Sequence, residues 1–211
     1  MNAEAAPVVL RPMREADLDQ VLAITASLKD APHWPRAAYL PALDPGATPR
    51  RIALVAEEIS GELGVLGGPG EKHTSRAKAQ PQSGNLIVRA EALTYHSPLT
   101  VQSGDSPSNG EEKGRSVVGF LIACLVTPQA ELESNAVSEA VQRQGIGRRL
   151  IAALAEELKV AGVREVFLEV RASNVRALGF YRSLGWIESG RRSRYYADPE
   201  EDAVLMSLRF E

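Results

Sequence analysis

The sequence has a single cysteine and no long apolar segment. One cysteine excludes a disulfide within the chain and is typical of a protein from a reducing compartment. Cys124 stands inside the apolar run 117–126, so we expect a buried structural thiol and not a nucleophile. No run approaches the ~20 apolar residues that span a bilayer, and the N-terminal residues do not resemble a signal peptide. The sequence therefore predicts a cytoplasmic protein with no membrane as a partner.

Strong charge of one sign and grouped metal ligands are also missing. With a net charge of −3, the chain gives no reason to expect nucleic acid as a partner. His33, His73 and His96 are scattered, without the spacing of metal ligands or of a catalytic triad. We therefore expect no metal cofactor and no histidine-activated nucleophile.

A chain of 211 residues, of which 44% are hydrophobic, can bury one sizeable core, and we expect residues 1–211 to form a single domain. Residues 60–115 interrupt it, because they are rich in Gly, Ser, Pro, Asn, Gln and Lys. Such a composition buries too little apolar surface to offset the entropy of ordering it. We expect a flexible, low-complexity insertion between two strands, with an apolar island at 86–93. A flap that binds a partner or selects a substrate is the alternative.

Outside this insertion, segments with the apolar spacing of strands alternate with segments that have the spacing of helices. Strands are expected at 8–11, 51–57, 116–126, 130–137, 163–170, 186–194 and 203–209. Helices are expected from 12, from 35, at 145–161 and at 174–184, the last two ended by glycines. Asp17 and Asp19 are expected to be solvated helix residues. The order predicts an α/β fold, or α+β under stricter naming, with helices on both sides of a mixed sheet.

Residues 142–150, Gln-Arg-Gln-Gly-Ile-Gly-Arg-Arg-Leu, form the segment around which the chain is organised. Two glycines precede an apolar stripe at helical spacing, so a polar loop opens directly into a helix. The N-terminus of a helix has unpaired N–H groups and a partial positive charge, and both favour a phosphate. Glycine lets the backbone approach an anion, and the arginines add formal charge. The segment therefore predicts a site for a phosphorylated cofactor.

Three kinds of phosphate-binding turn resemble this segment in outline. A P-loop requires Gly-Lys-Ser/Thr, whereas Gly147 is followed by two arginines. A dinucleotide fingerprint requires a third glycine where the chain has Leu150, although Glu169 does lie about 20 residues further on. The third is Gln/Arg-x-x-Gly-x-Gly/Ala, the pyrophosphate loop of the GNAT superfamily of acetyl-CoA-dependent N-acetyltransferases, which residues 142–147 match at every position. A tight turn without a ligand also contains Gly-x-Gly, so the motif needs support from other segments.

That support comes from Leu-Glu-Val-Arg-Ala-Ser-Asn at 168–174 and Tyr-Arg-Ser-Leu-Gly-Trp at 181–186. They closely resemble the ribosomal-protein-alanine N-acetyltransferases, a bacterial GNAT family that acetylates protein N-termini. The opening at 10–18 and the tail at 190–203 are also similar to this family. The resemblance implies the GNAT fold, acetyl-CoA as acetyl donor and a protein N-terminus, such as that of a ribosomal protein, as acceptor. It also implies that the strand 130–137 splays from its neighbour and that the pantetheine arm lies in the gap.

The resemblance further implies roles for individual residues. Glu169 matches the family's proton acceptor, and Tyr181 matches the proton donor to the coenzyme A thiolate. The implied cofactor-binding residues are Asn135, Ala136, Val137, Arg143, Gln144, Gly145, Ile146, Gly147, Arg148, Asn174 and Tyr181. Trp34, Tyr39 and Tyr195 are the implied substrate contacts. One departure stands out, because residues 134–137 read Ser-Asn-Ala-Val where the family usually has Asn-Ile-Ala-Val.

Other interpretations of these residues stay open. Glu169 could form an ion pair with Arg171 or with a helix arginine, and Tyr181 and the substrate-side aromatics could serve in packing. Asn174 is expected both to cap its helix and to contact the cofactor. The acceptor could be a lysine side chain or a small-molecule amine. An acetyl-CoA-binding sensor or interaction module without catalysis is the alternative of another class, and nothing in the sequence indicates the oligomeric state.

Overall fold

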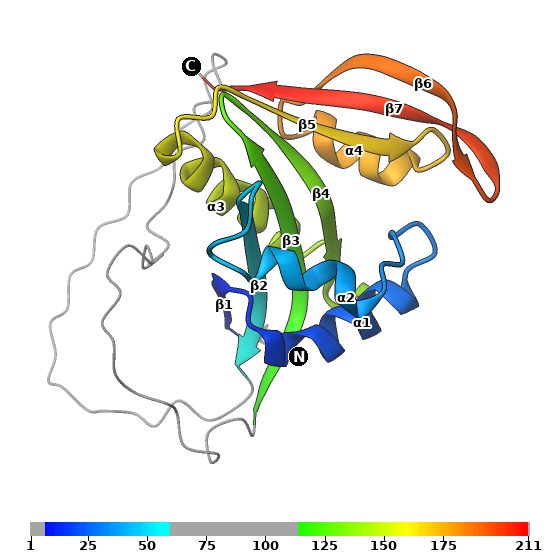
Figure 1. Ribbon diagram of the computed structural model, residues 1–211. Coiled ribbons are helices and arrows are strands. Elements are labelled where there is room, and N and C mark those ends of the chain that lie inside the picture. The colour runs from blue at the N-terminus through cyan, green and yellow to red at the C-terminus, as the bar shows by residue number, and fades with distance from the viewer. Residues whose placement is uncertain (1–6, 60–113, 211) are drawn as a thin grey trace, which may run out of the picture. The chain divides into compact units, whose positions relative to one another are not determined.

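The structure, a computed structural model, describes residues 7–59 and 114–210, which form one seven-stranded sheet with helices on both faces (Figure 1). The predicted insertion at 60–115, its apolar island and two of the histidines lie outside the described residues, except for the insertion's last two positions. The strands are β1 (Val8–Pro12), β2 (Arg51–Ile59), β3 (Arg115–Val126), β4 (Gln129–Val137), β5 (Glu165–Arg171), β6 (Ile187–Ala197) and β7 (Glu200–Arg209). The helices are α1 (Leu18–Ser27), α2 (Arg36–Tyr39), α3 (Ile146–Val160) and α4 (Val175–Arg182). Three short 3-10 turns complete them, at Glu15–Asp17, Leu40–Ala42 and Glu139–Val141.

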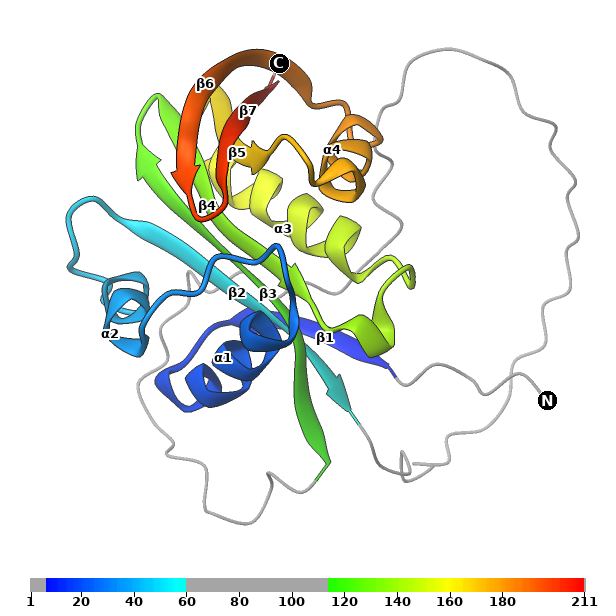
Figure 2. The same cartoon turned by 90° about the vertical axis from the view of Figure 1, so that its right-hand side faces the viewer.

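Two apolar layers hold the helices against the sheet, with α1 and α2 on one face and α3 and α4 on the other (Figure 2). Strand β3 lies between both layers. Phe120 and Ile122 belong to the core under α1, whereas Leu121 and Ala123 belong to the core under α3. A strand covered on both faces is apolar at every position, which explains the unbroken apolar run of β3. Cys124 is buried in this strand with 6% of its surface exposed, as predicted.

Helix α3 forms where its apolar stripe predicts it. Leu150, Ile151, Leu154 and Leu158 are buried against the sheet. The helix ends at Gly162, whose φ of +75° is the left-handed conformation that favours glycine. Two hydrogen bonds close the end, from Val163 N to Leu158 O at 2.9 Å and from Gly162 N to Lys159 O at 3.0 Å. Together they form a Schellman motif, so the predicted glycine stop is confirmed.

The sheet parts between β4 and β5. These strands are parallel and pair only from Gln129 with Glu165 to Glu131 with Phe167. Beyond this point β5 continues along β7 while β4 stays with β3, and the two strands diverge (Figure 1). The expected splay of β4 from its neighbour is therefore confirmed.

The structure differs from the prediction at the first helix and at the closing hairpin. Asp17 is 5% exposed, not solvated, and accepts hydrogen bonds from Arg11 Nη1 and Nη2 at 2.7 and 2.8 Å. Arg11 also donates to Glu57 Oε1 at 2.7 Å, so one guanidinium joins β1, β2 and the turn before α1. The hairpin β6–β7 is longer than the sequence predicts at both of its inner ends.

Within residues 7–59 and 114–210, no helix is long and apolar enough to cross a membrane.

Candidate functional site

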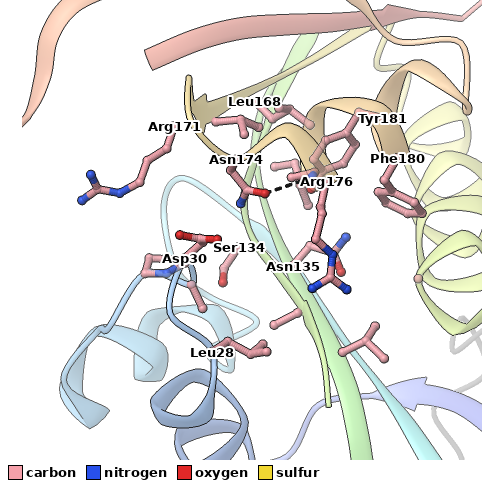
Figure 3. A pocket seen from close by; sticks show the side chains of 18 of the residues that line it. Leu28, Asp30, Ser134, Asn135, Leu168, Arg171, Asn174, Arg176, Phe180 and Tyr181 are labelled. Atoms are coloured by element: carbon pink, nitrogen blue, oxygen red, sulfur yellow. Dashed lines mark hydrogen bonds between the residues drawn. The ribbon is translucent and has the colours of Figure 1, made fainter. Parts of the chain in front are cut away.

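A cavity of about 1310 Å³ lies where β4 and β5 diverge (Figure 3). Its wall includes residues 28–34 after α1, the second half of β4, the end of β5 and the first two turns of α4. The loop before α3, the start of that helix and the β6–β7 hairpin also contribute. Both faces of the sheet therefore supply parts of one cavity. In the part of the chain that the structure describes, no three His, Cys, Asp or Glu side chains are grouped to hold a metal ion.

The loop before α3 and the first turn of that helix line this cavity. Gly145, the N-cap of α3, has φ of +84°, and no side chain caps the helix. A Cβ atom on Gly147 would lie 3.2 Å from Cζ of Phe180, so glycine allows α3 and α4 to approach closely. Arg143 and Arg148 line the cavity beside these glycines. An uncapped helix N-terminus with two adjacent arginines can hold a phosphorylated group.

The side chain of Gln142 fixes this loop in place. Its Nε2 donates to Val137 O at 2.9 Å, and its Oε1 accepts from Arg176 Nη2 at 2.5 Å. The first residue of the predicted motif thus ties the loop to the end of β4 and to α4. Sequence reasoning included Gln142 in the motif but did not predict this anchoring role, since its partners come from distant segments.

Asn174 and Tyr181 approach the cavity from α4. Asn174 Oδ1 accepts from Ala177 N at 3.0 Å, so its expected role as a helix cap is confirmed (Figure 3). Tyr181 is 8% exposed and packs between the rings of Phe180 and Trp186. Burial raises the pKa of Tyr181 to about 12, and the neighbouring Asn135 side chain opposes this rise in part. The phenol is therefore protonated at neutral pH and can act as a proton donor.

Glu169 lies on β5 in the wall of the same cavity, with 16% of its side chain exposed. Its Oε1 is 2.7 Å from Nη1 of Arg192 on β6. The neighbouring carboxylate of Glu169 is the main reason that the pKa of Tyr195 is raised. Glu169 thus forms an ion pair, as the alternative interpretation predicted, but its partner is Arg192 and not Arg171 or a helix arginine. Arg171 pairs instead with Glu201 at 3.3 Å.

The three aromatic residues expected to contact a substrate separate into two groups. Trp34 and Tyr195 line the cavity, and Tyr195 is 48% exposed. Tyr39 has no exposed surface, because its ring packs 5.4 Å from that of Trp34 and 6.2 Å from that of Phe120. The prediction of Tyr39 as a substrate contact is therefore wrong, and its alternative, a packing role, describes it. The remaining predicted cofactor positions of β4 and the loop, including Ala136 and Ile146, line the cavity except Gln144.

The arrangement matches that of known acetyltransferases. The Acetyltransferase (GNAT) family matches residues 88–186 of the chain. The ribosomal protein bS18-alanine N-acetyltransferase of Escherichia coli strain K12 is 44% identical over 135 residues, which are 63% of this chain and 84% of that protein. Among solved structures, the ribosomal-protein-S18-alanine N-acetyltransferase from Escherichia coli has a TM-score of 0.61 at 24% identity, covering 96% of this chain and 94% of that chain. The NatC complex bound to Gag peptide and CoA has a TM-score of 0.60 at 15% identity, covering 97% and 99%.

Proposed function

The chain belongs to the GNAT acetyltransferase family, and from this premise we propose that it transfers an acetyl group from acetyl-CoA to the N-terminal α-amine of a protein. The fold and the relatives make it an N-acetyltransferase. The proposed transfer from acetyl-CoA to an amine rests on one observation, that Glu169 and Tyr181 line the same cavity as the uncapped N-terminus of α3. A ribosomal protein that begins with alanine is the acceptor we propose, because the relative at 44% identity acts on one.

The cavity suits the parts of acetyl-CoA. The N–H groups at Gly145 and Gly147, with Arg143 and Arg148 beside them, can bind its pyrophosphate. The edge of β4 that β5 leaves unpaired runs to Val137, and its backbone groups can bind the amides of the pantetheine arm. When bound, acetyl-CoA supplies a thioester whose acetyl group is open to attack by an amine.

Glu169 is the proposed proton acceptor. An α-amine has a pKa near ~8, so a modest base suffices to take its proton at neutral pH. The ion pair with Arg192 fixes the direction in which the carboxylate of Glu169 points. Direct or water-mediated transfer of the amine proton to this carboxylate leaves the nitrogen lone pair free to attack.

Tyr181 is the proposed proton donor to the departing thiolate. Because burial keeps the phenol protonated, its proton is present when the carbon–sulfur bond breaks. A backbone N–H at the end of β4, near Val137, is the proposed hydrogen-bond donor to the acetyl oxygen during attack. Attack, oxygen stabilisation and thiolate protonation would then be carried out by separate groups of one cavity.

The test measures free thiol released from acetyl-CoA with two peptides. Both peptides have the same sequence, which begins with alanine and contains an internal lysine. The second peptide, the blocked twin, has an acetylated N-terminus. We expect turnover with the first peptide only, a large loss of turnover in Glu169→Gln and Tyr181→Phe, and CoA binding that is unchanged in Glu169→Gln. Turnover with the blocked twin would favour a lysine acceptor. CoA binding without turnover on either peptide would overturn the N-terminal assignment and favour a small amine or a sensor.

A further inference from the structure

The tip of the β6–β7 hairpin, residues 193–202, extends beyond the strand that supports the rest of the hairpin. The last pair between β5 and β7 is Arg171 with Ala203, so no residue of β5 pairs with the tip. The tip approaches the segment between α1 and α2, and both line the cavity (Figures 1 and 2). The cavity residues of the tip are Tyr195, Tyr196 and Asp198. Because a hairpin without a third strand is only marginally stable, the position of this cavity wall depends on other contacts.

The guanidinium of Arg171, at the end of β5, supplies such contacts. Its Nη2 donates to Asp198 O at 3.0 Å, and its Nη1 donates to Pro199 O at 3.3 Å. Nη1 also lies 3.3 Å from Glu201 Oε2, to which it donates. Its Cζ lies over the Tyr196 ring, 4.2 Å from the ring centre. One side chain thus joins β5 to both strands of the tip and to the turn between them.

The two residues that follow β5 add backbone contacts to the same tip. Ser173 N donates to Glu201 Oε1, and Ala172 N donates to Asp202 O at 3.1 Å. The carboxylate of Glu201 therefore accepts from Ser173 with one oxygen and from Arg171 with the other. Hydrogen bonds with an ionised partner are roughly twice as strong as those between neutral groups. We call residues 171–173 and Glu201 the hairpin anchor.

A bulge in β6 brings Tyr195 under the control of this anchor. Three residues of β6, 193–195, lie opposite the single residue Asp202 of β7. Asp202 Oδ1 accepts from Arg194 N at 2.9 Å, within the bulge. The backbone oxygen of Asp202 accepts from Ala172 N, so the segment that contains Tyr195 is tied to the end of β5.

We infer that Arg171 is a positioning residue for the acceptor, because it holds the hairpin tip where the tip bounds the cavity. Figure 3 shows its side chain pointing away from Tyr181, so it acts through the hairpin and not on the proposed proton donor. An acceptor that reaches Glu169 from the face of α1 passes between the tip and residues 28–34. This inference rests on the proposed function, since it assigns that side of the cavity to the acceptor.

The contacts of Arg171 require a guanidinium and not only a positive charge. A guanidinium donates in several directions within its plane, while its face stacks on an aromatic ring. A lysine ammonium is a compact point charge without this geometry. Arg171→Lys therefore keeps the charge of the cavity wall and removes most of the contacts to the tip. Arg209 is a matched control, because it joins β7 to Glu165 of β5 at 2.9 Å and neither of these two residues lines the cavity.

Steady-state kinetics with the alanine-starting peptide tests the role of the anchor. We expect Arg171→Lys to raise the KM for the peptide at least about fivefold, with kcat and the KM for acetyl-CoA changed by less than about twofold. Glu201 does not line the cavity, so Glu201→Ala loosens the tip without changing a group that could touch a ligand. It should raise the KM for the peptide by about threefold or more. Arg209→Lys should leave all three constants unchanged.

Amide hydrogen exchange tests the same contacts without substrates. We expect exchange at the tip to be at least about fivefold faster in Arg171→Lys and in Glu201→Ala than in the wild-type protein. Arg209→Lys should exchange there like the wild type, and circular dichroism should show that all three variants are folded.

Three results would overturn the inference. Unchanged exchange at the tip in Arg171→Lys would show that other contacts hold the hairpin. Faster exchange with an unchanged KM for the peptide would show that the tip does not position the acceptor. A higher KM in Arg171→Lys but not in Glu201→Ala would show that Arg171 acts on a ligand directly. If the wild-type protein acetylates neither peptide, the proposed function fails, whereas exchange at the tip still decides whether Arg171 holds the hairpin.

Discussion

Two glycines at opposite ends of α3 allow the anion site to be tested with matched substitutions. Gly145 precedes the helix with φ of +84°, and Gly162 follows it with φ of +75°. An added Cβ would meet no atom within 4 Å at either position. The two positions therefore share backbone conformation and open surroundings, but only Gly145 lines the cavity.

The expected stability changes follow from the backbone. A left-handed conformation costs an L-residue about 1–2 kcal/mol, and the smaller conformational freedom of alanine in the unfolded chain offsets about 0.4–1 kcal/mol of this. Gly145→Ala and Gly162→Ala should each lower the free energy of unfolding by roughly 1 kcal/mol. Gly179 lies within α4 without a positive φ, and its Cβ would also meet no atom within 4 Å. Gly179→Ala should therefore raise the free energy of unfolding by about 0.5–1 kcal/mol.

Affinity for CoA should separate the two destabilising variants. A methyl group on Gly145 would stand in front of the uncapped N–H groups, where a phosphate has to approach. We expect Gly145→Ala to raise the Kd for CoA at least about tenfold, or 1.4 kcal/mol, in isothermal titration calorimetry. Gly162→Ala should leave this Kd unchanged. Pantetheine lacks the pyrophosphate, so its weaker binding should be equal in all variants. A similar rise for Gly162→Ala, or an equal loss for pantetheine, would refute a pyrophosphate site at the start of α3.

Three further predictions concern other parts of the molecule. Asn174→Ala removes the cap of α4 and should lower the free energy of unfolding by about 1 kcal/mol in urea titrations, whereas Asn174→Ser should recover most of it. Burial raises the pKa of Tyr181 from 10 to about 12, so the folded protein holds this proton at a pH where the unfolded chain has lost it. The roughly 3 kcal/mol of stability present well below pH 10 should be lost progressively as the pH rises from about 9 to above 12, and this loss should be missing in Tyr181→Phe. Ile59 and Arg115 are paired at the ends of β2 and β3, so a two-residue Asn-Gly turn in place of residues 60–114 should close the hairpin. We expect this variant to have an unchanged kcat on an alanine-starting peptide. A large loss of kcat would make that segment part of the acceptor site.

The sequence predicts the features that depend on near neighbours. Successive residues of the apolar stripe, and the glycine that follows α3, are at most four residues apart, so helix spacing alone identifies them. The cap formed by Asn174 also depends only on the turn that follows it. The loop at 142–147 is identified by residue order, because its glycines act through their own backbone.

Features that depend on strand register could not be predicted. Arg192 reaches Glu169 because β7 lies between β5 and β6, and because irregular pairing shifts β6 along β7. Asp17 is buried because Arg11 of β1 lies between it and Glu57 of β2. Tyr39 is a candidate substrate contact in the sequence, with packing as the alternative, and α2 directs it onto Phe120. Each outcome requires knowing which strands are neighbours, which local spacing does not specify.

The divergence of β4 and β5 determines whether two substrates can be bound at the same time. A cavity bounded by residues 28–34 on one face of the sheet and by α3 and α4 on the other has room for two ligands that arrive from different sides. The proposed acetyl donor and acceptor could then be bound together, and the acetyl group would pass between them without a covalent acetyl-enzyme. Cys124 is 6% exposed and does not line the cavity, so the only thiol of the chain is not placed to carry it. We therefore expect intersecting lines in double-reciprocal plots, as for a ternary complex, and not the parallel lines of an acetylated enzyme.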